Sequence, residues 1–147
     1  MKKDADFFMF YFKTECCPFN KEHNKAQCVY YHNWQDFRRK PNIFTYDCHK
    51  LCKNWKAGTF IAKYQDGCEN MASCDSSHGW KEQDYHPLLY KTKPCPEETQ
   101  KLSPKSRKQC SRGIECPYYH SESEKRVPNN TYQLRERGDF PYQKLSE

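Results

Sequence analysis

Three segments of the chain place a cysteine four positions before a histidine, namely Cys28 before His32, Cys74 before His78 and Cys116 before His120. Two of these segments have a further cysteine six positions earlier, at Cys68 and Cys110. Thiolate sulfur and imidazole nitrogen are preferred ligands of Zn²⁺, and one short turn can present both to the same ion. The repeated spacing therefore predicts three bound Zn²⁺ ions.

A second repeated phrase, an aromatic residue followed by Lys-Thr, indicates where two of the sites begin. It precedes Cys17 in YFKTECC and Cys95 in LYKTKPC. In this register Cys17 is a ligand and Cys16 is a spacer. Since no cysteine lies between Cys17 and Cys28, His23 is the predicted second ligand of the first site. The alternative is that His23 is solvent-exposed and that water or Cys16 takes its place as a ligand. The first predicted set is Cys17, His23, Cys28 and His32, and the third is Cys95, Cys110, Cys116 and His120.

The first ligand of the second site is left open by the spacing. Cys48, His49 and Cys52 all lie upstream of Cys68, Cys74 and His78. The entropic cost of closing a loop rises only slowly with its length, so loop length does not choose among the three.

The elements that position these ligands must be small, because the chain is poor in aliphatic residues. Leu, Ile, Val and Phe make up 20 of its 147 residues, roughly 14% where ~20% is a lower bound for an ordinary core. The early apolar run FFMFYF is too short for a secretory or membrane-spanning segment. We therefore predict an intracellular protein, cytoplasmic or nuclear, with reduced thiols and no membrane partner. The net charge of +6 is moderately basic.

In these ligands and their surroundings the sequence resembles the tandem CCCH zinc-finger RNA-binding proteins. The block from Cys17 to His32, the arginine stretch before Pro41 and the Phe-x-Tyr at Phe44 follow the layout of the plant arginine-rich tandem CCCH group. There is also likeness to Unkempt and to tristetraprolin-type fingers. The family pattern places an aromatic residue three positions and a glycine six positions after the first cysteine of the second finger. Trp55 and Gly58 satisfy this for Cys52, so the resemblance implies the set Cys52, Cys68, Cys74 and His78.

The predicted fold class is therefore small, irregular zinc-stabilised domains, three CCCH-type zinc fingers with short helical turns and little regular sheet. Finger one, with its aromatic lead-in and arginine stretch, spans residues 6–40. Finger two spans 41–80 and contains an apparent insertion at 59–66. The linker and finger three span 81–120, and 121–147 is predicted to be a flexible polar tail.

The predicted function is zinc-dependent binding of single-stranded RNA, expected to be mRNA, in post-transcriptional regulation. Basic side chains would neutralise phosphates, and aromatic rings beside rigid loops would stack on unpaired bases. The predicted RNA contacts are Tyr30, Tyr31, Arg38, Arg39, Lys91, Arg112, Tyr118 and Tyr119. Finger two carries no aromatic residue between Cys68 and His78, which indicates a spacer or a protein contact.

Four protein ligands close a zinc site, which disfavours catalysis at the metal. We therefore predict that the chain is not an enzyme and has no small-molecule substrate. One alternative is a zinc-finger scaffold subunit of a larger ribonucleoprotein or protein complex, contacted through finger two or the tail. The other is a ribonuclease, an activity associated with some plant relatives, for which the sequence offers no catalytic residues.

Overall fold

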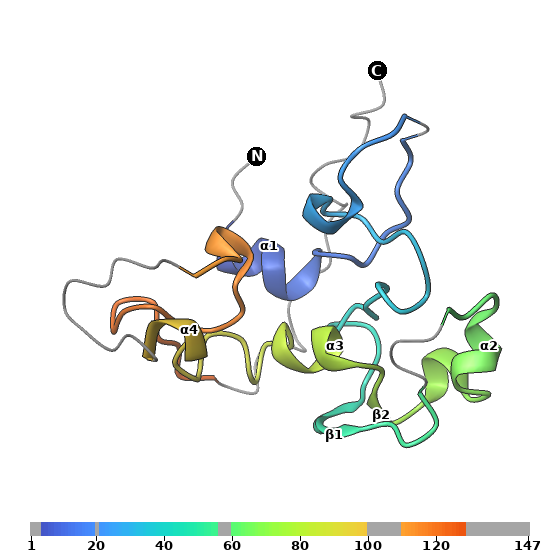
Figure 1. The fold of residues 1–147 in the computed structure, drawn as a ribbon. Coiled ribbons are helices and arrows are strands. Elements are labelled where there is room, and N and C mark those ends of the chain that lie inside the picture. The colour runs from blue at the N-terminus through green and yellow to red at the C-terminus, as the bar shows by residue number, and fades with distance from the viewer. Residues whose placement is uncertain (1–3, 20, 56–59, 100–109, 129–147) are drawn as a thin grey trace.

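Regular structure is sparse in the computed structural model, which describes residues 4–19, 21–55, 60–99 and 110–128 (Figure 1). Its helices are α1 (Ala5–Phe10), α2 (Tyr64–Gly67), α3 (Trp80–Asp84) and α4 (Pro96–Thr99). Strands β1 (Asp47–Leu51) and β2 (Ser76–Ser77) pair in parallel, with Asp47 opposite Ser76 and Leu51 opposite Ser77. None of the described helices is long and apolar enough to cross a membrane. The predicted fold class is confirmed.

Three short 3-10 turns repeat in register with the Cys/His spacing. They are η1 (Lys25–Gln27), η2 (Met71–Ser73) and η3 (Gly113–Glu115), and each directly precedes the third predicted ligand of its site. The backbone N–H of Cys28, Cys74 and Cys116 donates to the first carbonyl of its turn, over 3.3, 3.2 and 3.2 Å respectively. The sequence repeat is therefore also a repeat of backbone conformation.

Helix α1 is formed by most of the apolar run FFMFYF and is capped at both ends. A helix of six residues is unstable alone, because nucleation is costly and its terminal backbone groups lack partners. At its start, the Asp4 carboxylate accepts the N–H of Phe7 over 3.0 Å. At its end, the Arg38 guanidinium donates to the carbonyls of Phe8, Met9 and Phe12 over 2.8–3.0 Å. Arg38 thus serves as a buried C-terminal cap.

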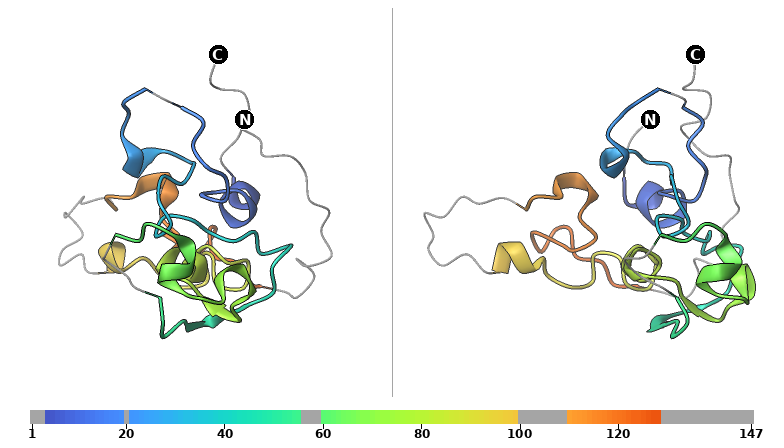
Figure 2. Two further views of the ribbon diagram at one scale, coloured as in Figure 1. Left: turned by 90° about the vertical axis from the view of Figure 1, so that its right-hand side faces the viewer. Right: turned by 45° about the vertical axis from the view of Figure 1, so that its right-hand side comes forward.

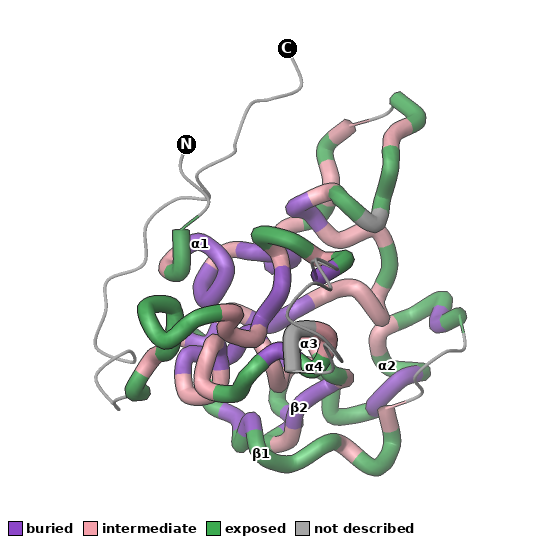
Figure 3. The backbone as a smooth tube through the Cα atoms, turned by 60° about the vertical axis from the view of Figure 1, so that its left-hand side comes forward, coloured by how far each residue is buried: buried purple, intermediate pink, exposed green. Residues whose placement is uncertain are grey.

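The aromatic core joins segments that the ligand spacing assigns to different fingers. Its buried members are Phe7, Phe8, Met9, Phe10, Phe12, Val29, Tyr30, Tyr85 and Tyr90. Phe8 packs parallel to Tyr90, and Phe12 lies 4.9 Å from Tyr85 between ring centroids. Figure 3 shows α1 as a largely buried segment. The lead-in of finger one and the linker before finger three therefore share one core.

Helix α3 lies at the centre of the molecule, and the three fingers spread from it in different directions (Figures 1 and 2). Its Glu82 forms a fully buried ion pair with Arg39, 2.7 Å between Oε1 and a guanidinium nitrogen. Its Lys81 pairs with Asp36 of finger one, and its Asp84 accepts the hydroxyl of Tyr118 from finger three. A five-residue helix therefore holds all three fingers together.

Candidate metal sites and nucleic-acid interface

The structure brings the twelve predicted ligands together in three groups. Within each group the potential ligand atoms all lie within 4.8 Å of one another. The groups are Cys17, His23, Cys28 and His32; Cys52, Cys68, Cys74 and His78; and Cys95, Cys110, Cys116 and His120. Cys48 is buried outside these groups and Cys16 is exposed. Each group is able to hold a metal ion, as three zinc fingers require.

The spacing within the groups suits tetrahedral zinc. One pair of sulfur atoms in each group is 3.8 Å apart: Cys17 with Cys28, Cys52 with Cys68, and Cys95 with Cys116. A tetrahedron with Zn–S distances of ~2.3 Å has sulfur–sulfur edges of ~3.8 Å, whereas a disulfide bond is ~2.0 Å long. Burial raises the pKa of the Cys74 and Cys116 thiols to about 11 and about 12. A cation is therefore needed to hold these thiolates at neutral pH.

Within the described part of the chain, His78 and His120 each have one ring nitrogen without a protein hydrogen-bond partner, free for the ligand group, and a protein partner on the other ring nitrogen. Nε2 of His78 and Nε2 of His120 are buried without a hydrogen-bond partner among the described residues. Nδ1 of His78 lies 3.0 Å from the Tyr64 hydroxyl, and Nδ1 of His120 lies 3.3 Å from Glu124. Burial lowers the pKa of His78 to about 4, so its ring is neutral at pH 7. Such an outer partner orients a metal-binding imidazole and fixes its tautomer.

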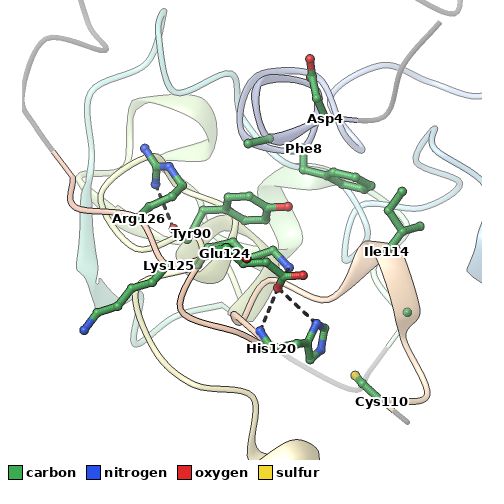
Figure 4. A pocket seen from close by; sticks show the side chains of 13 residues that line it. Asp4, Phe8, Tyr90, Cys110, Ile114, His120, Glu124, Lys125 and Arg126 are labelled. Atoms are coloured by element: carbon green, nitrogen blue, oxygen red, sulfur yellow. Dashed lines mark hydrogen bonds and ion pairs between the residues drawn. The ribbon is translucent and has the colours of Figure 1, made fainter.

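An acidic residue four positions after each final histidine is a signal that the sequence analysis missed. Glu82 accepts the backbone N–H of His78 over 2.7 Å, and Glu124 accepts that of His120 over 2.8 Å. Asp36 lies 3.9 Å from Nδ1 of His32. Figure 4 shows Glu124 beside His120, on the wall of a cavity of about 800 Å³ that also borders α1. The repeated unit is therefore longer than Cys-x3-His.

The two Lys-Thr lead-ins adopt the same conformation and serve the same structural role. Lys13 and Lys91 have left-handed backbones, with φ of 60° and 57°. The ammonium of Lys13 donates to the carbonyl of Tyr30, and that of Lys91 to the carbonyl of Tyr118, each over 3.0 Å. Lys91 also pairs with Glu124. Both lysines therefore brace the loop that carries their finger's Cys-x3-His segment.

Finger three extends beyond His120 into the segment 121–147 that was predicted to be a flexible tail. The N–H of Arg126 donates to the carbonyl of Lys91 over 2.9 Å, as the N–H of Arg38 does to Lys13. The Arg126 guanidinium donates to the carbonyl of Tyr90 over 2.9 Å (Figure 4), and to that of Pro87 over the same distance. Residues 121–126 therefore belong to the folded unit; residues 129–147 of the predicted tail lie outside the described residues.

The predicted insertion in finger two builds part of the second site. Its Tyr64 stacks on Trp34 of finger one, 4.8 Å between ring centroids, and hydrogen-bonds His78. Trp55 stacks on His78, with 4.4 Å between ring centroids, and also makes an edge-to-face contact with Tyr64. At Gly67 an added Cβ would lie 2.6 Å from the Trp55 ring. Thr59 of this insertion and Gly58 lie outside the described residues.

Three of the predicted RNA contacts are internal in the structure. Arg38 and Arg39 have no exposed surface, and Tyr30 is 3% exposed. Arg38 caps α1, and Arg39 binds Glu82 and the carbonyls of finger two. The basic run at these positions supplies internal hydrogen bonds, so neither guanidinium is available to phosphates. We therefore do not retain these three residues as RNA contacts.

The other predicted aromatic and arginine contacts are partly exposed beside the first and third groups. Tyr31 lines a cavity of about 280 Å³ at the first group, together with Phe19, Lys21 and Lys25. At the third group, the Arg112 guanidinium lies 5.2 Å from the centre of the Tyr118 ring. Tyr119 is also partly exposed, with Lys125 5.8 Å from its ring centre. The surface beside each of these two Cys/His groups thus combines aromatic rings with cationic side chains.

Comparisons with known proteins agree with this geometry. A CCCH zinc-finger family model, described as AtC3H23-like, matches residues 6–39. The RING finger protein unkempt homolog of Homo sapiens is 35% identical over 115 residues, which are 76% of this chain and 13% of that protein. Zinc finger CCCH domain-containing proteins 29 and 20 of Arabidopsis thaliana are each 30% identical, over 84% and 85% of this chain and 18% and 30% of their own lengths. The chain thus spans less than a third of these relatives. It is a tandem CCCH zinc-finger protein related to Unkempt and to the plant CCCH proteins.

Proposed function

We propose that the zinc-loaded chain binds single-stranded RNA through fingers one and three, and that its targets are mRNAs under post-transcriptional control. The observation that carries the proposal is the pairing of aromatic rings with cations beside both Cys/His groups. Rings of this kind stack on unpaired bases whatever the sequence, and the cations attract the phosphates. Bases in a duplex are already stacked, so the arrangement favours single strands.

Finger two is proposed to be a spacer. The two aromatic side chains nearest its Cys/His group, Trp55 and Tyr64, pack against His78. The exposed part of its loop carries Glu69 and Asp75, which would repel phosphates. Fingers one and three therefore provide the RNA surface in this proposal.

A protein-scaffold role is the second candidate, and it is favoured by exposed apolar side chains on finger two. Phe60 is 79% exposed and Leu51 is 56% exposed. Large apolar side chains in such positions are common at protein interfaces. No catalytic role is proposed, because each group already offers four protein ligands and leaves no open position on a tetrahedral ion.

The experiment is a titration of zinc-loaded protein into fluorescently labelled single-stranded RNA, followed by anisotropy at several salt concentrations. Tyr118→Ala is expected to weaken binding about 5- to 150-fold, because stacking contributes ~1–3 kcal/mol per base. Phe60→Ala is the matched control, since it removes an exposed ring on finger two. Zinc content should stay at the wild-type value in both variants.

Two results would count against RNA binding by finger three. One is a Tyr118→Ala protein that keeps its zinc and its affinity. The other is an affinity that does not change with salt, because phosphate contacts release counterions and must weaken as salt rises. The scaffold role would instead be supported by a protein partner that binds the wild type equally well at all salt concentrations and does not bind Phe60→Ala.

A further inference from the structure

We propose that Trp80 is a second base-stacking residue, which binds the nucleobase next to the one on Tyr118. This inference rests on the proposed function, because its ligand is the same single-stranded RNA. Trp80 is the first residue of α3 and is 48% exposed. The other two tryptophans are partly buried, Trp34 stacked on Tyr64 and Trp55 stacked on His78. Among the three, Trp80 presents the most open ring to a ligand.

Arg112 connects Trp80 to the RNA surface of finger three. Its guanidinium carbon lies 6.0 Å from the centre of the Trp80 ring and 5.2 Å from that of Tyr118. A cation between two aromatic rings is attracted to both. The three side chains therefore form a continuous partly exposed surface across the junction of α3 and finger three.

A hydrogen bond fixes the same arrangement independently. The Tyr118 hydroxyl donates to Asp84 over 2.7 Å, and Asp84 lies four positions after Trp80 on α3. Residues four apart lie on the same helix face. Helix α3 is held in turn by the buried Glu82–Arg39 ion pair. Both rings are thus held on rigid elements, which lowers the entropic cost of binding.

The charges around Trp80 suit a polyanion. The Lys81 ammonium lies 5.6 Å and the Arg112 guanidinium 6.0 Å from its ring centre, and the positive charge of the exposed Lys93 acts on Asp84. Lys81 is paired with Asp36, and Asp84 accepts the Tyr118 hydroxyl. Arg112 and Lys93 together outweigh the single carboxylate of Asp84, so one positive charge is in excess around Trp80. This balance favours RNA over an acidic or purely apolar protein segment.

The test uses the zinc-loaded chain with Trp80→Ala, Trp80→Phe and the matched control Phe60→Ala. Trp80→Ala is expected to weaken binding of single-stranded RNA about 5-fold or more, since each stacked base contributes ~1 kcal/mol or more. Trp80→Phe retains a ring and should keep most of the affinity. Phe60→Ala should bind like the wild type.

Tryptophan fluorescence reports stacking directly. Saturating RNA should quench the wild-type signal, and the quenching should largely disappear in Trp80→Phe although RNA still binds. Wild-type affinity in zinc-loaded Trp80→Ala, or undiminished quenching in Trp80→Phe, would overturn the proposal. If Tyr118→Ala weakens binding and the Trp80 variants do not, only this inference fails. If the wild type binds no RNA, the proposed function fails with it.

Discussion

Replacing Glu82 with Gln should destabilise the whole molecule, because this residue holds the fingers to α3. Glu82 has no exposed surface. Its carboxylate accepts hydrogen bonds from the backbone N–H groups of Arg39 and His78 and from two guanidinium nitrogens of Arg39, over 2.7–3.0 Å. A glutamine keeps one acceptor oxygen and turns an N–H₂ donor toward these donors. The Arg39 charge then stays buried without its partner.

The expected loss of stability is about 3–5 kcal/mol, the usual cost of removing one member of a buried ion pair. Burial is the largest single influence on the pKa of Arg39 and tends to lower it, but the hydrogen bonds and the negative charge of Glu82, together with smaller contributions from nearby groups, raise it overall. The pair therefore stabilises the charged guanidinium. For a chain of this size, each kcal/mol corresponds to roughly 2–4 °C in melting temperature. A decrease on the order of 10 °C is expected for Glu82→Gln.

The assay is thermal unfolding of zinc-saturated protein, followed by circular dichroism. Glu15→Gln is the matched control, because Glu15 pairs with Lys40 over 3.1 Å but is 40% exposed. An exposed pair contributes about 1 kcal/mol or less, so this variant should melt within a few degrees of wild type. Equal melting temperatures for the two variants would refute the role of Glu82 as the central link.

Two further predictions concern the first metal group and the effect of pH. Cys17→Ser should lower zinc content by one ion per chain and unfold finger one, whereas Cys16→Ser should leave both unchanged; the reverse result would mean that the ligand register is wrong. Burial lowers the pKa of His86 to about 3, below the ~6.5 of an unfolded histidine. As the pH falls below about 6.5, His86 of the unfolded chain binds a proton but His86 of the native chain does not. The free energy of unfolding should therefore decrease by up to ~1.4 kcal/mol per pH unit. Urea unfolding of zinc-saturated protein between pH 6.5 and 5.5 should show that the unfolding free energy of His86→Asn changes less with pH than that of the wild type. An equal change with pH in the two proteins would contradict a buried neutral His86 ring.

The three ligand groups could be predicted because the residues that define each group lie close together in the sequence. The Cys-x3-His spacing, the 3-10 turn before each third ligand and the Lys-Thr lead-in all act within one finger. Choosing Cys52 over Cys48 took the family pattern, since loop length alone does not discriminate. The acidic residue four positions after each final histidine was equally local and could have been found by extending the alignment past the ligands.

The roles of Arg38, Arg39 and Tyr30 could not be predicted from local sequence. A basic run before a proline has the same pattern whether it faces solvent or carbonyl groups. For Arg39 the deciding partner, Glu82, lies 43 positions away. For Trp80 the deciding neighbour is Arg112 of another finger. Tertiary packing of one finger against the next therefore determines which cations and rings remain exposed for the proposed RNA contacts.

The most direct test of RNA binding is ultraviolet crosslinking of the zinc-loaded chain to single-stranded RNA, with crosslinked residues mapped by mass spectrometry. Crosslinks are predicted at Tyr118 and Trp80 of the finger-three surface and at Tyr31 of finger one, and they should be lost after zinc chelation. The buried Tyr30 should carry none. Absence of crosslinks from the zinc-loaded chain, or crosslinks confined to residues 41–79, would contradict the proposed RNA surface.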